Sequence, residues 1–135
     1  MIISGSEDRT VKIWQPNKPT ITLVEHQAAV KGVAISPNNK YLASVDDDGR
    51  IILWHKANGT WQQLQRLSGH NNSIWSVAFS PDSQTLATAG EDSKVMLWHL
   101  NPILQLDILQ YACNWAKNYL QYSAEVNLQD RIFCK

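Results

Sequence analysis

Apolar residues alternate with small or polar ones along short stretches of the chain, with the period of two that is typical of β-strands. One such stretch is SIWSVAFS (residues 73–80), and β-type composition resumes in TLATAG (85–90) after the turn sequence PDSQ. A second turn sequence, EDSK, separates TLATAG from VMLW (95–98), whose residues suit a pleated surface. The pattern therefore predicts consecutive short strands joined by tight turns.

The same succession recurs with a period of about 40 residues. Trp14, Trp54 and Trp98 lie 40 and 44 residues apart, and His26 and His70 are also separated by 44 residues. Aspartate stands six residues before each of these tryptophans, and serine or threonine stands ten before, at Asp8, Asp48 and Asp92 and at Ser4, Ser44 and Thr88. Repetition at this length is the signature of an array of similar supersecondary units.

A complete unit is predicted to hold four antiparallel strands. The fourth strand is TITLV (20–24) in the first unit and WQQLQRL (61–67) in the second, where Asn58-Gly59 is a strong hairpin signal. A meander with two apolar faces cannot bury itself alone, so the units are expected to stack as propeller blades. The predicted blades are residues 2–24, which lack the first strand, residues 29–67, which are complete, and residues 73–98, which lack the last strand.

Four motifs resemble the WD-repeat β-propeller family in their order and spacing: SGH (68–70), VAFSPD (77–82), LATAGED (86–92) and VMLW (95–98). The resemblance covers residues 1–100 and implies a mainly β fold, a partial propeller of about two and a half four-stranded blades. Closed propellers have about four to eight blades, so the chain is too short to close one. Copies of the chain that shared one blade would duplicate two of its strands, so closure by a homo-oligomer is not expected. We expect a C-terminal piece of a longer WD-repeat protein, or else a chain completed by a separate partner.

The resemblance also implies networks of buried hydrogen bonds. In one network Trp54 donates to Ser44, whose hydroxyl meets His26, whose other ring nitrogen meets Asp48; the second comprises Trp98, Thr88, His70 and Asp92. The first unit keeps Ser4, Asp8 and Trp14 without a histidine. Ser/Thr, His and Asp together also suggest a hydrolase, but the sequence has no GxSxG elbow and one copy uses threonine. We therefore expect a structural network and no catalytic residues.

The contact surface of the family maps by resemblance onto the loops before the first strands and the turns between the second and third strands. These positions are Lys31 and Trp75, Ala29 and Ser73, and Glu7, Asp47 and Glu91. We expect a protein partner there, with Trp75 as the hot spot. The three acidic residues favour a basic segment of the partner, and ordinary solvated turns are the alternative.

After Trp98 the pattern changes to helical spacing, and residues 101–135 are expected to form a helical tail. Asn101 and Pro102 are typical of a helix start. The tail resembles the segment after the last repeat of bacterial multi-repeat WD proteins, at Cys113, Trp115, Tyr119, Leu120, Asp130, Arg131 and Cys134. Such proteins often carry N-terminal effector modules. The alternative function is therefore the sensor arm of a signalling enzyme or nucleotide-binding switch.

Composition narrows the functional classes. Twelve basic residues balance twelve acidic ones, which argues against a nucleic-acid partner or an anionic membrane surface. The sequence has no long apolar run and no signal peptide, so a cytoplasmic location is expected. Its two cysteines form no CxxC pair and no metal-ligand cluster, so neither metal nor cofactor is expected. The sequence favours a non-catalytic protein-interaction scaffold or sensor module, which needs further blades in cis or in trans to close.

Overall fold

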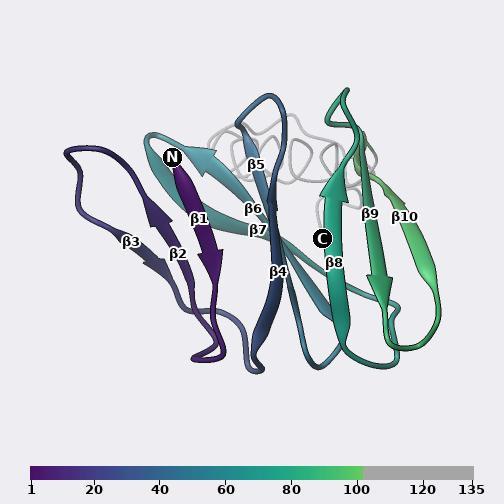
Figure 1. Cartoon of the computed structure of the whole chain (residues 1–135). Helices are drawn as coiled ribbons and strands as arrows, with labels where there is room; N and C mark the ends of the chain where they lie inside the picture. Colours follow the sequence, from purple (N-terminus) through teal and green to yellow (C-terminus); the bar gives the residue numbers. More distant parts are fainter. Residues whose placement is uncertain (102–135) are drawn as a thin grey trace, which may run out of the picture. The chain divides into compact units, whose positions relative to one another are not determined.

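The structure is a computed structural model that describes residues 1–101, in which ten β-strands form three sheets (Figure 1). The predicted mainly β fold and its division into three, four and three strands are confirmed. Apart from its first residue, the predicted helical tail lies outside the described residues. The first sheet contains β1 (Ile2–Gly5), β2 (Val11–Trp14) and β3 (Ile21–Leu23); the middle sheet contains β4 (Val30–Ile35), β5 (Tyr41–Asp46), β6 (Arg50–Ala57) and β7 (Thr60–Ser68); the last sheet contains β8 (Ile74–Phe79), β9 (Thr85–Gly90) and β10 (Val95–His99).

Each sheet is an antiparallel meander whose strand order follows the chain. The turns β1–β2, β5–β6 and β9–β10 are alike, because each has a residue of positive φ at the same repeat position: Arg9 (69°), Gly49 (78°) and Ser93 (60°). At Gly49 a side chain would also collide with the loop that leads into the last sheet. A Cβ atom there would lie 2.7 Å from the carbonyl oxygen of His70 and 2.8 Å from that of Asn72. Glycine at this position therefore lets the middle and last sheets approach closely.

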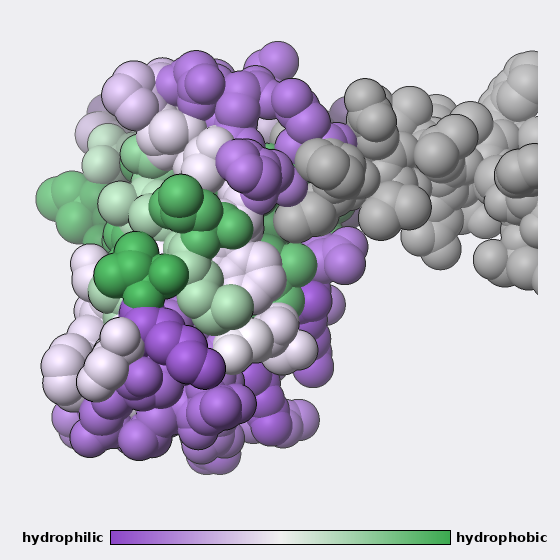
Figure 2. Space-filling model, turned by 90° about the vertical axis from the view of Figure 1, so that its right-hand side faces the viewer, coloured by the Kyte–Doolittle hydropathy of each residue, from purple (hydrophilic) through white to green (hydrophobic). Residues whose placement is uncertain are grey.

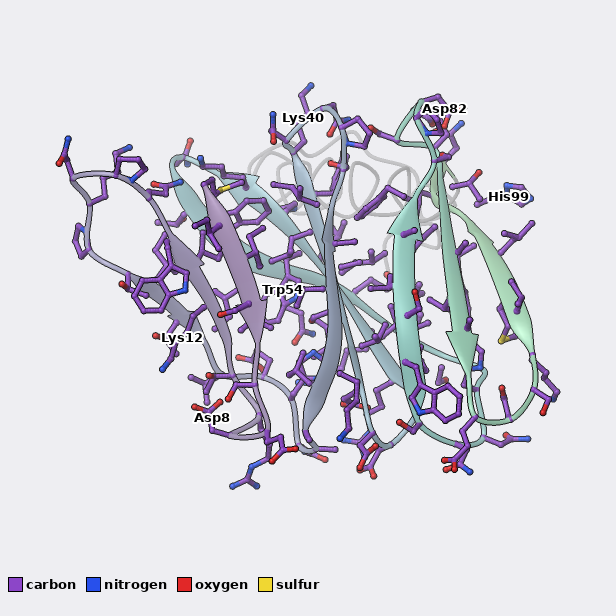
Figure 3. All side chains as sticks on the ribbon, viewed as in Figure 1. Asp8, Lys12, Lys40, Trp54, Asp82 and His99 are labelled. Carbon is purple, nitrogen blue, oxygen red and sulfur yellow. The ribbon has the colours of Figure 1, made fainter. Side chains whose placement is uncertain are left out.

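One face of the middle sheet packs against the first sheet. Strand register places Leu42 opposite Trp54 and Ser44 opposite Ile52, so these four side chains share a face. Trp54 is only 2% exposed, and Figure 3 shows it in the layer between the first sheet and β4. The hydrophobic core at this junction consists of Val11, Ile13, Leu23, Val30, Leu42, Ile52, Trp54 and Trp61.

The opposite face of the middle sheet packs against the last sheet. Register places Val45 opposite Ile51 and Ala43 opposite Leu53, and all four side chains are fully buried. On the same face, a Cβ atom at Gly32 would lie 3.5 Å from the Val77 side chain of β8. The middle sheet is therefore covered on both sides.

Each outer sheet leaves one apolar face open to solvent. Trp14 of the first sheet is 47% exposed and Ile2 is 70% exposed, while Val95 and Leu97 of the last sheet are 73% and 64% exposed. Figure 2 shows the outer side of the last sheet, where hydrophobic residues gather across the middle between hydrophilic ends. Within residues 1–101, no further sheet packs on either face. The described residues also contain no helix long and apolar enough to cross a membrane.

Candidate functional site

The histidine network of the last sheet has the predicted members. His70 Nδ1 lies 2.9 Å from Asp92 Oδ1, and His70 Nε2 lies 2.8 Å from the Thr88 hydroxyl. The Trp98 indole N–H donates to the same hydroxyl at 3.0 Å. The backbone N–H of Asn71 donates to the other Asp92 oxygen at 3.2 Å, which ties the loop before β8 to the β9–β10 turn. The structure thus brings His70, Thr88, Asp92 and Trp98 together, with Asp92 and Trp98 only partly buried.

The network of the middle sheet uses a carboxylate that sequence analysis did not choose. His26 Nε2 lies 2.6 Å from the Ser44 hydroxyl, and the Trp54 indole N–H donates to that hydroxyl at 2.8 Å, as predicted. His26 Nδ1, however, lies 2.7 Å from Asp46 Oδ2, so the predicted role of Asp48 is wrong. Asp48 is exposed in the turn, where its backbone N–H donates to Asp46.

The use of Asp46 in place of Asp48 is explained by one repeat position at which the middle and last sheets have different residues. Asp46 ends β5 at the position that Gly90 occupies in the last sheet, eight residues before the tryptophan that recurs in each repeat. A Cβ atom at Gly90 would point at the ring, 2.9 Å from His70 Nδ1. A carboxylate at the equivalent position of the middle sheet therefore reaches its histidine directly and displaces the turn aspartate. The sequence did contain a signal for this exchange, because the equivalent positions of the other two repeats are Ser6 and Gly90 and only the middle repeat has an aspartate there.

Both networks form a continuous line of hydrogen bonds when the imidazole carries its proton on Nδ1. The indole N–H then donates to the hydroxyl, the hydroxyl donates to Nε2, and Nδ1–H donates to the carboxylate, so every polar group of the network has a partner. Burial alone would raise the pKa of the Asp46 carboxyl, but hydrogen bonds from His26 and from the backbone N–H of Arg50 outweigh it and hold the pKa below its usual value. The pKa of Asp92 is lowered against burial in the same way, by His70 and the N–H of Asn71.

The first sheet keeps only a remnant of this network. The Trp14 indole N–H lies 3.5 Å from the Ser4 hydroxyl, close to the limit for a hydrogen bond. Asp8 does not join them, because its carboxylate accepts hydrogen bonds from the hydroxyl and the N–H of Thr10, at 2.6 and 3.0 Å. The structure therefore does not bring the three predicted residues of this sheet together.

The histidines and hydroxyl groups of the two networks are buried, as is typical of a structural role. Ser44 and Thr88 are at most 1% exposed, so a substrate cannot reach their hydroxyl groups in this fold. Within residues 1–101, no group of three or more His, Cys, Asp or Glu side chains could hold a metal ion. Each network ties two neighbouring strands to the loop that precedes the sheet's first strand, and it offers no accessible nucleophile.

The residues predicted to bind a partner gather at one end of the sheets, here named the turn end. It comprises the turns of residues 6–9, 46–49 and 90–93 and the first residues of β4 and β8. In Figure 3, Asp8 marks this end, and Lys40 and Asp82 mark the opposite end.

Lys31 and Trp75 occupy β-bulges at the turn end. Val30 pairs with Asp46 and Gly32 with Val45, so Lys31 has no residue opposite it in β5. The register of β8 shifts at the equivalent place, which leaves Trp75 unpaired beside β9. Bulges redirect side chains and are common beside functional sites. Trp75 is 62% exposed, as a contact residue requires.

Asp47 connects the middle and last sheets at the turn end. Its carboxylate accepts a hydrogen bond from the Ser73 hydroxyl at 2.7 Å and lies 3.8 Å from the ammonium group of Lys31. Its backbone N–H donates to the Ala29 carbonyl at 3.0 Å, and the equivalent N–H of Glu91 donates to Ser73 at 2.8 Å. Ser73 is buried, so it holds the turns in place and does not itself face a partner.

The burial of the predicted contact residues divides them into two groups. Lys31, Trp75, Glu7, Asp47 and Glu91 are exposed, whereas Ser73 is buried and Ala29 is partly buried. The exposed group includes one acidic residue from the turn of each sheet. A partner that lies across the turn end can therefore meet all three sheets.

A family model described as "WD domain, G-beta repeat" matches residues 1–15, 17–55 and 61–99, which is most of the chain. These segments contain every strand in full except the last two residues of β6 and the first residue of β7.

Three curated proteins illustrate the similarity. The chain is 43% identical over 54 residues to nuclear distribution protein nudF of Aspergillus terreus, which covers 39% of this chain and 12% of that protein. It is 32% identical over 93 residues to nuclear distribution protein PAC1 of Scheffersomyces stipitis, covering 51% and 18%. It is 35% identical over 72 residues to the Notchless protein homolog of Arabidopsis thaliana, covering 51% and 15%. The chain thus spans less than a fifth of each relative, and these eukaryotic proteins lend no support to the expected bacterial resemblance.

Proposed function

Because the chain belongs to the WD-repeat family, we propose that it is a non-catalytic protein-interaction module whose partner binds at the turn end. The observation that carries this proposal is the environment of Trp75. A bulge in β8 holds this large aromatic side chain, 62% exposed, at the turn end of the last sheet. Tryptophan is among the residues that dominate binding energies at protein interfaces, and an exposed one on a rigid strand loses little freedom on binding.

The acidic residues of the turn end favour a partner segment with basic residues. Glu7, Asp47 and Glu91 are exposed, and each belongs to the turn of a different sheet. Asp47 is already oriented by Ser73, so its position does not need to be fixed by the partner. An extended basic segment across the turns would meet a carboxylate at each sheet in succession, which supports specificity and a fast encounter.

An array of extended peptides with basic, acidic and neutral sequences tests this proposal. We expect the chain to retain basic peptides and Trp75→Ala to lose them, with an unchanged circular-dichroism spectrum. Trp14→Ala is the matched control, because Trp14 is the other strongly exposed tryptophan among residues 1–101 and lies at the end of β2 remote from its turn. The replacement of Glu7 and Glu91 by glutamine should weaken binding and reduce its dependence on salt.

Two results would contradict the proposal. If Trp75→Ala and Trp14→Ala retained the peptides equally, the turn end would not be the contact surface. If acidic and neutral peptides bound as well as basic ones, the acidic turns would be ordinary solvated loops.

We further propose that the two open faces of the outer sheets pack against additional WD blades, in the same polypeptide or in another chain. The support is their exposure: Trp14 and Leu97 occupy repeat positions that are buried in the middle sheet, at Trp54 and Leu53. The chain would then be a piece of a larger propeller, or the sensor arm of a longer signalling protein. In-frame repeats in the genomic DNA before the Met1 codon, together with a monomeric extended chain, would support this; an absence of such repeats would oppose the longer protein.

A cytoplasmic site of action is also part of the proposal and rests on composition alone. Microscopy of the tagged chain in its own cell tests it.

A further inference from the structure

The open face of the last sheet has the chemistry of a face that the same molecule buries. We name it the Leu97 face; strand register places on it Ser76, Ala78, Ala87, Ala89, Val95 and Leu97. The equivalent residues of the middle sheet are, in the same order, Gly32, Ala34, Ala43, Val45, Ile51 and Leu53. The two sets differ by little more than a few methyl groups. The second set is covered by the last sheet, whereas Val95 and Leu97 are mostly exposed.

The open face of the first sheet is of the complementary type. We name it the Trp14 face; register places on it Ile2, Ser4, Lys12 and Trp14. The equivalent residues of the middle sheet, Leu42, Ser44, Ile52 and Trp54, pack against the first sheet. A hollow of about 290 Å³ lies on the Trp14 face between β1 and the end of β2, lined by Met1, Ile2, Trp14, Gln15 and Pro16. It offers space for apolar side chains of a facing sheet.

Both internal junctions pair one face of each type. At the first junction, Val11 and Ile13 of the first sheet meet Leu42 and Trp54 of the middle sheet. At the second, Gly32 of the middle sheet approaches Val77 of the last sheet, which shares a face with Thr88 of the network. The described part of the chain therefore ends in one unpaired face of each type.

We propose that the Leu97 face of one copy of this chain binds the Trp14 face of a second copy, in the packing seen at the internal junctions. This inference rests on the proposal that the open faces take further blades, and it names the chain that supplies them. The contact stacks intact sheets face to face, so no blade has to be shared between copies. Because the two surfaces differ, the contact is heterologous, and repeated stacking gives a closed ring or an open chain of copies.

Four versions of the full chain separate this contact from non-specific aggregation. Val95→Asp/Leu97→Asp blocks the Leu97 face, and Ile2→Asp/Trp14→Ser blocks the Trp14 face. Lys40→Asp is the control, because it changes the net charge by the same amount as the first variant on an exposed loop remote from the turn end (Figure 3). The replaced residues are exposed, so the variants should keep the wild-type circular-dichroism spectrum and melt.

Sedimentation velocity over a series of concentrations is the readout. We expect the wild-type chain and Lys40→Asp to grow in mass with concentration, and each blocked variant alone to remain a monomer. An equimolar mixture of the two blocked variants should form a dimer with one copy of each and nothing larger, because one complementary pair of faces survives.

Three results would overturn the proposal: a wild-type chain that stays monomeric at every concentration, a blocked variant that still associates with itself, or a mixture that stays monomeric. A monomeric wild-type chain would exclude the second copy but leave the proposal of further blades to the test of the extended chain. Growth of both blocked variants would indicate non-specific adhesion between apolar surfaces.

Discussion

The middle sheet and the two outer sheets repeat one sequence pattern but differ in how much of it they bury. Trp54 is 2% exposed in the middle sheet, whereas Trp14, at the same repeat position in the first sheet, is 47% exposed. Leu53 is 1% exposed, whereas its equivalent in the last sheet, Leu97, is 64% exposed. Burial in this fold is therefore set by the neighbouring sheet and not by the sequence of the repeat itself.

The comparison indicates where stability resides. Apolar side chains contribute most when contacts on both sides exclude water, so the middle sheet should carry most of the stability of the described residues. The outer sheets keep most of these residue types on one face without that gain, although Lys12 replaces Ile52 on the face of Trp14. The proposals above rest on this likeness between an open face and a buried face of the same molecule.

The largest effect is expected for Trp54→Ala. This change leaves a cavity at the first junction and removes the indole donor to Ser44, so the free energy of unfolding should fall by about 3–5 kcal/mol. The same change at Trp14 should cost less than about 1 kcal/mol, because half-exposed contacts contribute little. Urea unfolding at a concentration where the chain is monomeric measures both. Similar losses for the two variants would contradict the difference between the sheets.

The next effect distinguishes the aspartates of the middle sheet. Asp46→Ala strips the partner from His26 Nδ1 and from two backbone N–H groups, which should cost about 2–4 kcal/mol, as the sum of unsatisfied buried groups. Asp48→Ala removes an exposed side chain and should change stability by less than about 0.5 kcal/mol. In the last sheet the turn aspartate holds the histidine, so Asp92→Ala should be the damaging change there. Equal effects of Asp46→Ala and Asp48→Ala in chemical denaturation would refute the assignment.

A smaller effect is expected at the turns. Gly49→Ala forces a Cβ into the carbonyl groups of His70 and Asn72 at positive φ, and should cost about 1–3 kcal/mol. Ser93→Ala, at the equivalent position of the last sheet, should be nearly neutral, because that turn already holds a side chain at φ 60°. Thermal unfolding of these two variants tests whether the packing of the middle sheet against the last sheet requires glycine at position 49. A tolerated Gly49→Ala would show that the loop before the last sheet yields easily.

The effect of pH on the free energy of unfolding should be smaller still and should follow the protonation of Asp46. Its pKa is lowered in the folded chain from the ordinary value of 3.8, so the folded state binds its proton less readily than the unfolded state does. The stabilisation is therefore fully present above about pH 5 and is lost as the pH falls through the lowered pKa. Asp46→Asn should be less stable at neutral pH and lose less on acidification. An unchanged acid profile, measured as the urea midpoint against pH, would show that other carboxylates dominate.

Much of the fold could be predicted from the sequence, because the repeat period places every strand relative to a tryptophan. The resemblance to the WD-repeat family located His70, Thr88 and Asp92, where one turn aspartate was available. It failed at Asp46, since three aspartates follow one another at residues 46–48 and a period cannot choose among neighbours. It also placed Ser73 on the contact surface, although the side chain turns inward to Asp47.

The features that escaped prediction depend on contacts between sheets. The bulges at Lys31 and Trp75 arise from pairing with the adjacent strand, which hydrophobic alternation does not show. The exposure of Val95 and Leu97 depends on whether another sheet packs on them, and their own sequence is indistinguishable from that of a buried strand. Local sequence thus determines which residues share a face, whereas the neighbouring sheet determines whether that face is covered.

The most direct test of this account is the chemical accessibility of the two equivalent faces. Cysteine is introduced at position 53 in one variant and at position 97 in another, and maleimide labelling is followed by peptide mapping, so that labels on the native cysteines are counted separately. In dilute solution, Leu97→Cys should react about as fast as an unstructured thiol, and Leu53→Cys should react only when the protein unfolds. Equal labelling rates at the two positions would contradict the central claim that a neighbouring sheet, and not the repeat sequence, decides which face is buried.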